Sequence, residues 1–131
     1  MMRALLAAAL VLAGTASAPA QAAEPQRSAQ FERCYNNPDS TTLSLRACIG
    51  AEYKRQDARL NGAYAEAMRS LNPAAQARLR TAQRAWITYR DADCQAVLAA
   101  NGGTMAPMLA DLCYLDRTTQ RADELEDFSK P

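Results

Sequence analysis

The chain has no histidine among its 131 residues, and its five glycines include only one adjacent pair. The absence of histidine removes the usual general base near neutral pH and a frequent zinc ligand. The pair Gly102-Gly103 follows an expected helix and not a strand, so it does not indicate a phosphate-binding loop. Asp91 and Asp93 are two positions apart on an expected helix and face different sides, which does not favour a two-carboxylate hydrolase. We therefore expect a protein that is not an enzyme and that binds no cofactor or metal.

The sequence also has no excess of charge of either sign. It contains 15 lysines and arginines against 14 aspartates and glutamates. Residues 1–22 include Arg3 and no acidic residue, which leaves 14 basic and 14 acidic side chains in the rest of the chain. Non-specific binding to nucleic acid or to an anionic membrane needs a basic patch or stripe. The charge balance therefore argues against both kinds of partner.

The one long apolar run lies at the start of the chain and is short. It extends from Ala4 to Ala16, about 13 residues, whereas a membrane-spanning helix needs about 20. Met1-Met2-Arg3 precedes it, and Ala20-Gln21-Ala22 follows as a small-x-small cleavage sequence, a pattern typical of a secretory signal peptide. We therefore predict a signal peptide over residues 1–22, with cleavage after Ala22 favoured over cleavage after Ala18. The alternative is a membrane anchor that stays attached.

No cysteine lies near the cleavage region, where a lipoprotein signal would need one in the place of Thr15. We expect no lipid anchor and no stable membrane anchor after signal cleavage. The expected product is soluble and either periplasmic or secreted from a bacterium.

Four cysteines follow the apolar run. They are Cys34, Cys48, Cys94 and Cys113. An even number of cysteines in a small exported chain is typical of a disulfide framework. The alternative is a zinc site of four thiolates, but the spacings of 13, 45 and 18 intervening residues lack the close pairs of zinc ribbons.

The rest of the chain has the pattern of helices. Residues 23–40 are polar and contain Pro25 and Asn37-Pro38-Asp39, so we expect a mobile start followed by a turn. From residue 41 to residue 127, apolar residues recur every three or four positions, which predicts helices. The expected helices cover residues 41–71, 73–100 and 104–127. The predicted fold class is all-α, a small antiparallel three-helix domain stapled by two disulfides.

The antiparallel arrangement suggests which cysteines pair. Cys94 lies eight residues before Gly102, and Cys113 lies ten residues after Gly103, so two antiparallel helices would bring them level. Cys34 would then pair with Cys48. The sequence alone permits three connectivities. Each bridge of this pairing closes a loop that is worth about 3 kcal/mol in the chain-entropy model.

Polar residues interrupt the apolar stripes of all three expected helices. They are Asp57, Asn61, Gln83, Arg90 and Arg121. A buried arginine must be paired, because an unpaired buried charge is very costly. We therefore expect a structural polar network, built on an Asp57–Arg90 pair or extended to Asn61 and Gln83. The alternative places some of these groups in a groove that faces a partner.

An acidic cluster closes the last expected helix. It consists of Asp123, Glu124, Glu126 and Asp127. Acidic side chains are disfavoured at a helix C-terminus by the helix dipole. The cluster is therefore a candidate binding surface for a basic partner, and the alternative is a solvated, frayed tail.

Several of these segments together resemble a known family. The run from Gln83 to Cys94, Asp57 with Leu60-Asn61 and Tyr64, and Gly102-Gly103-Thr104 are similar to the LprI-like lysozyme-inhibitor domain family. Cys113 with Thr118, Arg121 and Leu125 extends the similarity, which covers about residues 34–125. The resemblance implies an exported bacterial helical domain with paired cysteines, and the family name implies binding and inhibition of lysozyme.

We therefore expect a periplasmic binding protein that inhibits lysozyme by occlusion of its cleft. The expected contacts are the acidic end of the last helix and the exposed turn between the second and third helices. The alternative is a structural or accessory cell-envelope module that binds another envelope protein or a small ligand.

Overall fold

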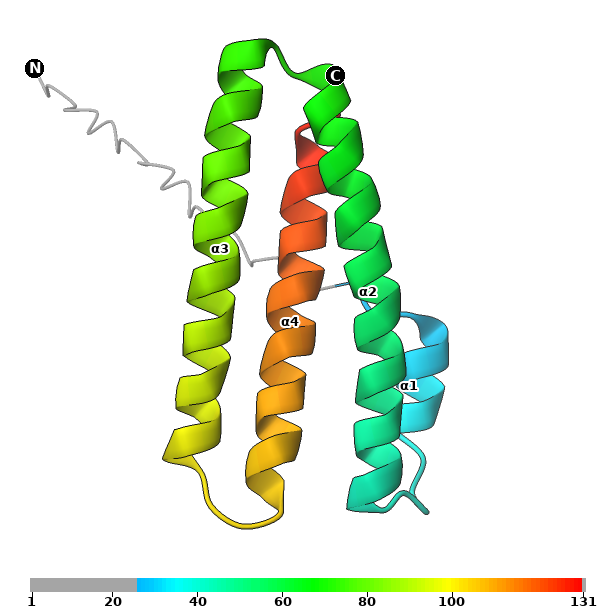
Figure 1. The fold of residues 1–131 in the computed structure, drawn as a ribbon. Coiled ribbons are helices and arrows are strands. Elements are labelled where there is room, and N and C mark those ends of the chain that lie inside the picture. The colour runs from blue at the N-terminus through cyan, green and yellow to red at the C-terminus, as the bar shows by residue number, and fades with distance from the viewer. Residues whose placement is uncertain (1–25, 131) are drawn as a thin grey trace, which may run out of the picture.

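The computed structural model describes residues 26–130, which form four helices and no strand (Figure 1). They are α1 (Ala29–Tyr35), α2 (Thr42–Ser70), α3 (Pro73–Ala100) and α4 (Met105–Asp127). The all-α class is confirmed, and the three long helices lie where the apolar periodicity places them. The expected helix number of three is wrong, because α1 forms within the segment 23–40. The predicted signal peptide lies outside the described residues.

Consecutive long helices run antiparallel, so α2 and α4 run in the same direction, and α4 lies between α2 and α3 (Figure 1). It packs along α2 and along α3, while α2 and α3 are joined at one end by the short connection at Leu71 and Asn72. Because the main packing of both α2 and α3 is against α4, the sides of α2 and α3 that face each other remain free of close backbone contact.

The short helix α1 packs against α2. Its N-cap is Ser28, whose side chain accepts a hydrogen bond from the backbone N–H of Phe31. Phe31 is 1% exposed and packs in a core cluster with Ile49, Met108 and Leu115. A helix of 7 residues is not stable in isolation, so this tertiary packing is what stabilises it.

The ends of the long helices follow the local sequence. Thr41 and Ser44 form a capping box at the start of α2. Asn72 caps α3, and Pro73 occupies its first turn, where the missing N–H costs nothing. Gly103 has a φ of 65°, the left-handed conformation that glycine adopts without strain. Thr104 is at the N-cap position of α4, but its side chain makes no capping hydrogen bond.

Both disulfides connect the expected partners. Cys34 of α1 pairs with Cys48 in the second turn of α2, with a Cα–Cα distance of 5.9 Å. Cys94 of α3 pairs with Cys113 of α4, with a Cα–Cα distance of 5.5 Å. The two bridges therefore hold α1 on α2 and α3 on α4.

A second core cluster lies further along the bundle, between α2, α3 and α4. Its members are Leu60, Ala63, Ala67, Leu79, Ala122 and Leu125. The alanines let the helix backbones approach closely, and Trp86 packs partly buried against the edge of the cluster. None of the four helices is long and apolar enough to cross a membrane.

Candidate functional site

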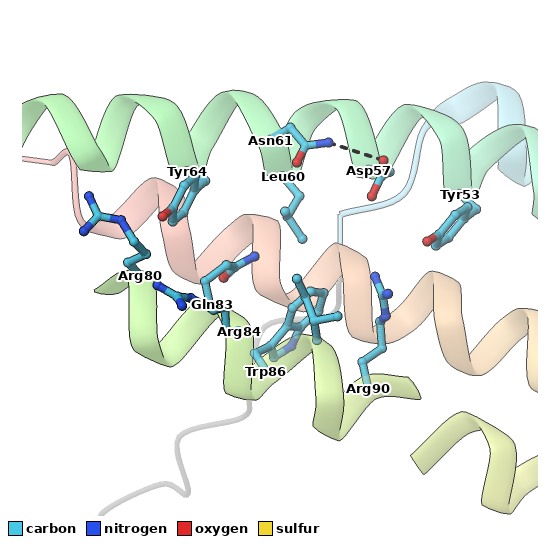
Figure 2. A pocket seen from close by; sticks show the side chains of 11 residues that line it. Tyr53, Asp57, Leu60, Asn61, Tyr64, Arg80, Gln83, Arg84, Trp86 and Arg90 are labelled. Carbon is cyan, nitrogen blue, oxygen red and sulfur yellow. Dashed lines mark hydrogen bonds between the residues drawn. The ribbon is translucent and has the colours of Figure 1, made fainter. Parts of the chain in front are cut away.

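A groove of about 440 Å³ runs between α2 and α3 over the edge of the second core cluster (Figure 2). This volume lies within the range of small-ligand sites, about 300–1,000 Å³. The groove is lined by Tyr53, Asp57, Leu60, Asn61 and Tyr64 of α2 and by Arg80, Gln83, Arg84, Trp86, Ile87 and Arg90 of α3. We call it the α2–α3 groove.

The α2 wall is a stripe of residues three or four positions apart, the spacing of one helix face. Leu60 points into the core and is almost fully buried. Asp57 and Asn61 lie beside it, and Nδ2 of Asn61 donates a hydrogen bond of 3.3 Å to Oδ2 of Asp57. Within residues 26–130, the Asp57 carboxylate accepts no other hydrogen bond. The wall thus presents one carboxylate between two tyrosines.

The α3 wall carries three arginines, Arg80, Arg84 and Arg90. Asp57 is the one acidic residue in the lining, so the groove has a formal excess of two positive charges. Arg80 and Arg84 are exposed, and their side chains form no hydrogen bond or ion pair with the rest of residues 26–130. The groove is therefore cationic although the chain as a whole is nearly neutral.

Arg90 is held in place by its neighbours. Its side chain is 14% exposed, and the guanidinium carbon lies 5.0 Å from the ring centroid of Trp86 and 5.6 Å from that of Tyr114. Its Nη2 is 2.8 Å from an oxygen of Asp91. Stacking between rings orients a guanidinium and lowers the entropy that it loses on binding.

The expected polar network is divided into separate pairs. Asn61 bonds Asp57, and Nε of Arg121 donates to Oε1 of Gln83 at 2.9 Å. Arg90 pairs with Asp91 and not with Asp57, because the two side chains extend from opposite walls of the groove (Figure 2). Asp57, Asn61, Gln83 and Arg90 nevertheless meet at one place, the α2–α3 groove.

Every acid of the cluster at the end of α4 has a basic partner, although three cations serve the four acids. Arg59 of α2 binds Oδ1 of Asp123 at 2.5 Å and Oε1 of Glu126 at 2.7 Å. Its hydrogen bond lowers the pKa of Glu126, and the same bond raises the pKa of Arg59. Glu124 pairs with Arg121, and Asp127 pairs with Lys130. The cluster is therefore much less negative than its sequence suggests.

Sequence reasoning missed Glu52, the most buried acidic residue of the described chain. It accepts hydrogen bonds from the backbone N–H and hydroxyl of Ser28, and from Gln56 and Arg55. Burial by itself raises the pKa of Glu52, but these bonds together outweigh burial and lower the pKa to about 2. The available signal was its position three residues after Ile49, within the apolar stripe.

One other cluster contains atoms of the kind that bind metals. Asp93, Cys94 and Cys113 place their side-chain oxygen and sulfur atoms within 4.8 Å of one another. The two sulfurs are bonded to each other, so they offer no thiolate, and Asp93 accepts a 2.9 Å hydrogen bond from Arg117. In its oxidised form this cluster is a disulfide with a neighbouring ion pair.

Paired cysteines, an all-helical bundle and a cationic groove characterise a small disulfide-stapled helical domain. The family model described as lysozyme inhibitor LprI matches residues 34–125. The match covers more than half of the chain, and the chain belongs to this family.

Two relatives are described as uncharacterised proteins. A protein of Rhizobium meliloti (strain 1021) is 33% identical over 132 residues, which cover 90% of this chain and 88% of that protein. The protein YecT of Escherichia coli (strain K12) is 32% identical over 76 residues, which cover 49% of this chain and 47% of YecT. No solved structure matches the chain.

Proposed function

We propose that this chain is an exported bacterial envelope protein that binds a lysozyme and inhibits it by covering its cleft. The observation that carries the proposal is the family match over residues 34–125. Two disulfides support export, because disulfides persist in oxidising compartments such as the periplasm. The inhibition is steric, and the chain supplies no catalytic step.

The two expected contact surfaces lie at opposite ends of α4. This helix has 23 residues, so its ends are about 33 Å apart at 1.5 Å per residue. Arg59, Arg121 and Lys130 offset three of the four charges of the acidic cluster, which weakens its attraction for a basic partner. Residues 101–104, which join α3 to α4, are all exposed at the other end of the bundle. We therefore favour this turn as the part that enters a lysozyme cleft.

The turn is well supported for such a contact. The disulfide between Cys94 and Cys113 holds together α3 and α4, the two helices that flank the turn. A Cβ atom added at Gly102 would meet no heavy atom within 4 Å, so the turn has free space around it. A preorganised surface loses less conformational entropy when it docks, and this favours tight binding.

A turbidity assay tests the proposal, with the purified, oxidised protein added to a chicken-type lysozyme that is clearing a bacterial cell suspension. We expect dose-dependent protection of the cells, lost when the disulfides are reduced. Gly102→Arg is expected to weaken protection at least tenfold by blocking entry of the turn. The matched control is Gly62→Arg, because Gly62 is exposed on α2 and also has no heavy atom within 4 Å of an added Cβ.

Each outcome assigns the contact or rejects it. If neutralising Asp123, Glu124, Glu126 and Asp127 together abolishes protection while Gly102→Arg does not, the contact is the acidic cluster. If the protein gives no protection at large molar excess, inhibition of this lysozyme class is rejected. The second candidate, an accessory envelope module that binds a small ligand or another protein, is favoured by the cationic α2–α3 groove and would then lead.

A further inference from the structure

We propose that the α2–α3 groove binds a small sugar acid, a ligand that combines carboxylates with ring hydroxyls. The groove lies along the middle of α2 and α3, and none of its lining residues belongs to the turn 101–104. The proposal therefore stands or falls independently of lysozyme inhibition.

The arginines of the groove indicate an anionic ligand. Most arginines of the described chain form ion pairs, for example Arg46 with Asp111 and Arg117 with Asp93. Arg80 and Arg84 differ, because they have no acidic partner in residues 26–130 and both line the groove one helical turn apart. A guanidinium presents a planar fork of N–H donors that matches a carboxylate in two parallel hydrogen bonds. Two such forks on one helix face fit a ligand with more than one acidic group.

Arg90 adds a third donor at the other end of the α3 wall. It is packed against Trp86 and Tyr114, so its orientation exists before any ligand arrives. Asp91 occupies one side of its guanidinium. The remaining N–H groups face the groove from the wall opposite Asp57 (Figure 2).

Asp57 indicates that the ligand is not a bare anion. An ionised carboxylate only accepts hydrogen bonds, and it repels a phosphate or a simple carboxylate nearby. Within the described residues its single donor is Asn61, which bonds Oδ2 and leaves Oδ1 open. A ligand hydroxyl satisfies this acceptor. A ligand that matches the groove therefore has hydrogen-bond donors facing α2 and anionic acceptors facing α3.

The rings that flank the polar groups fit a sugar. Tyr53, Tyr64 and Trp86 are partly exposed and line the same groove. Aromatic side chains give an apolar face, which suits the C–H face of a pyranose, and the tyrosines add hydroxyls that donate and accept. The volume of about 440 Å³ and the open side suit a small ligand that remains partly in solvent.

The test is a titration of the oxidised, ¹⁵N-labelled protein followed by ¹H–¹⁵N spectra, with digalacturonate as the probe. We expect saturable shifts in amides of residues 53–64 and 80–90. Arg80→Ala with Arg84→Ala should weaken binding at least tenfold. The matched control is Arg33→Ala with Arg78→Ala, which also removes two exposed arginines that have no acidic partner in residues 26–130, both outside the groove. Its effect should be less than twofold.

Three further arms separate the alternatives. Digalactose, the neutral analogue, should bind at least tenfold more weakly, and equal binding would overturn the anionic assignment. Asp57→Ala should weaken the binding of digalacturonate, because the carboxylate that accepts from a ligand hydroxyl is lost. The same change should strengthen the binding of inorganic phosphate, because the repulsion of anions is lost with it. Phosphate that binds the unaltered groove as tightly as digalacturonate would overturn the sugar assignment. Absence of groove shifts at the highest soluble digalacturonate concentration would overturn the whole proposal.

Discussion

Glu52 of α2 accepts two hydrogen bonds from Ser28, one from the backbone N–H at 2.8 Å and one from the hydroxyl at 2.6 Å. The same hydroxyl oxygen accepts the hydrogen bond from Phe31 that caps α1. The position of α1 therefore depends on a buried carboxylate 24 residues further along the chain. The disulfide between Cys34 and Cys48 fixes the other end of this small helix.

Glu52→Ala is expected to destabilise the protein by about 3 kcal/mol, because Ser28, Gln56 and Arg55 all lose a charged acceptor in a buried place. The measurement is the free energy of unfolding from urea titration at neutral pH. Glu66→Ala serves as the control, since Glu66 is exposed and pairs only with Arg69 on the same helix. A loss below about 1 kcal/mol for Glu52→Ala would contradict the anchoring role of Glu52.

The pKa of Glu52 predicts a loss of stability in acid. Its pKa falls from 4.5 to about 2 in the folded protein, so the folded state favours the ionised form. The resulting stabilisation is fully present above about pH 4.5 and is lost as the pH falls towards 2. The shift corresponds to about 3 kcal/mol at 1.36 kcal/mol per pKa unit. Urea titrations between pH 6 and pH 2 measure it, and the Glu52→Gln variant should show a correspondingly smaller decrease.

Removal of either disulfide is expected to cost about 3 kcal/mol in the chain-entropy model, since the sequence separations are 14 and 19 residues. The two removals should differ in what is released. Cys34→Ser with Cys48→Ser should raise amide hydrogen exchange mainly in α1, because this bridge ties α1 covalently to α2 and a helix of 7 residues is not stable in isolation. Cys94→Ser with Cys113→Ser should raise it near the turn 101–104. Identical exchange patterns in the two variants would show that the bridges do not act locally.

Arg59→Ala is expected to destabilise the protein by about 1–2 kcal/mol. The arginine side chain is 24% exposed and joins α2 to Asp123 and Glu126, and its loss leaves two acids unopposed at the C-terminus of α4. The acids are 35% and 41% exposed, so solvent screening keeps the effect well below that of a buried pair. Thermal unfolding measures it, with Arg69→Ala as the exposed control. The difference between the two variants should shrink at high salt.

The sequence predicted the long helices because their evidence is local. Apolar residues every three or four positions, Thr41 as a cap, Pro73 at a first turn and Gly103 at a turn act within a few residues of themselves. The antiparallel order then placed Cys94 level with Cys113. The helix α1 was missed because its 7 residues are too few for a periodic pattern. Its stabilising contacts come from distant residues, since Glu52 accepts the hydrogen bonds of Ser28, and Phe31 packs against Ile49, Met108 and Leu115.

The candidate site was only partly predictable. Asp57, Asn61, Gln83 and Arg90 were recognised as polar residues on apolar stripes, and they do line one groove. The expected bond between Asp57 and Arg90 does not form, because both helices pack mainly against α4 and their facing sides are separated. The basic partner of Asp123 and Glu126 could not be predicted from the sequence, because Arg59 lies 64 and 67 residues away from them along the chain.

The sequence by itself therefore determined the three long helices and their ends, because hydrogen bonding and capping within a helix depend on near neighbours. Only the tertiary structure decided which charges meet and which stay open. Arg59 pairs with Asp123 and Glu126 of the acidic cluster, while Arg80 and Arg84 remain without acidic partners in the described chain. The reason is physical: an ion pair needs its two groups within a few ångströms, and that separation is set by how the helices pack.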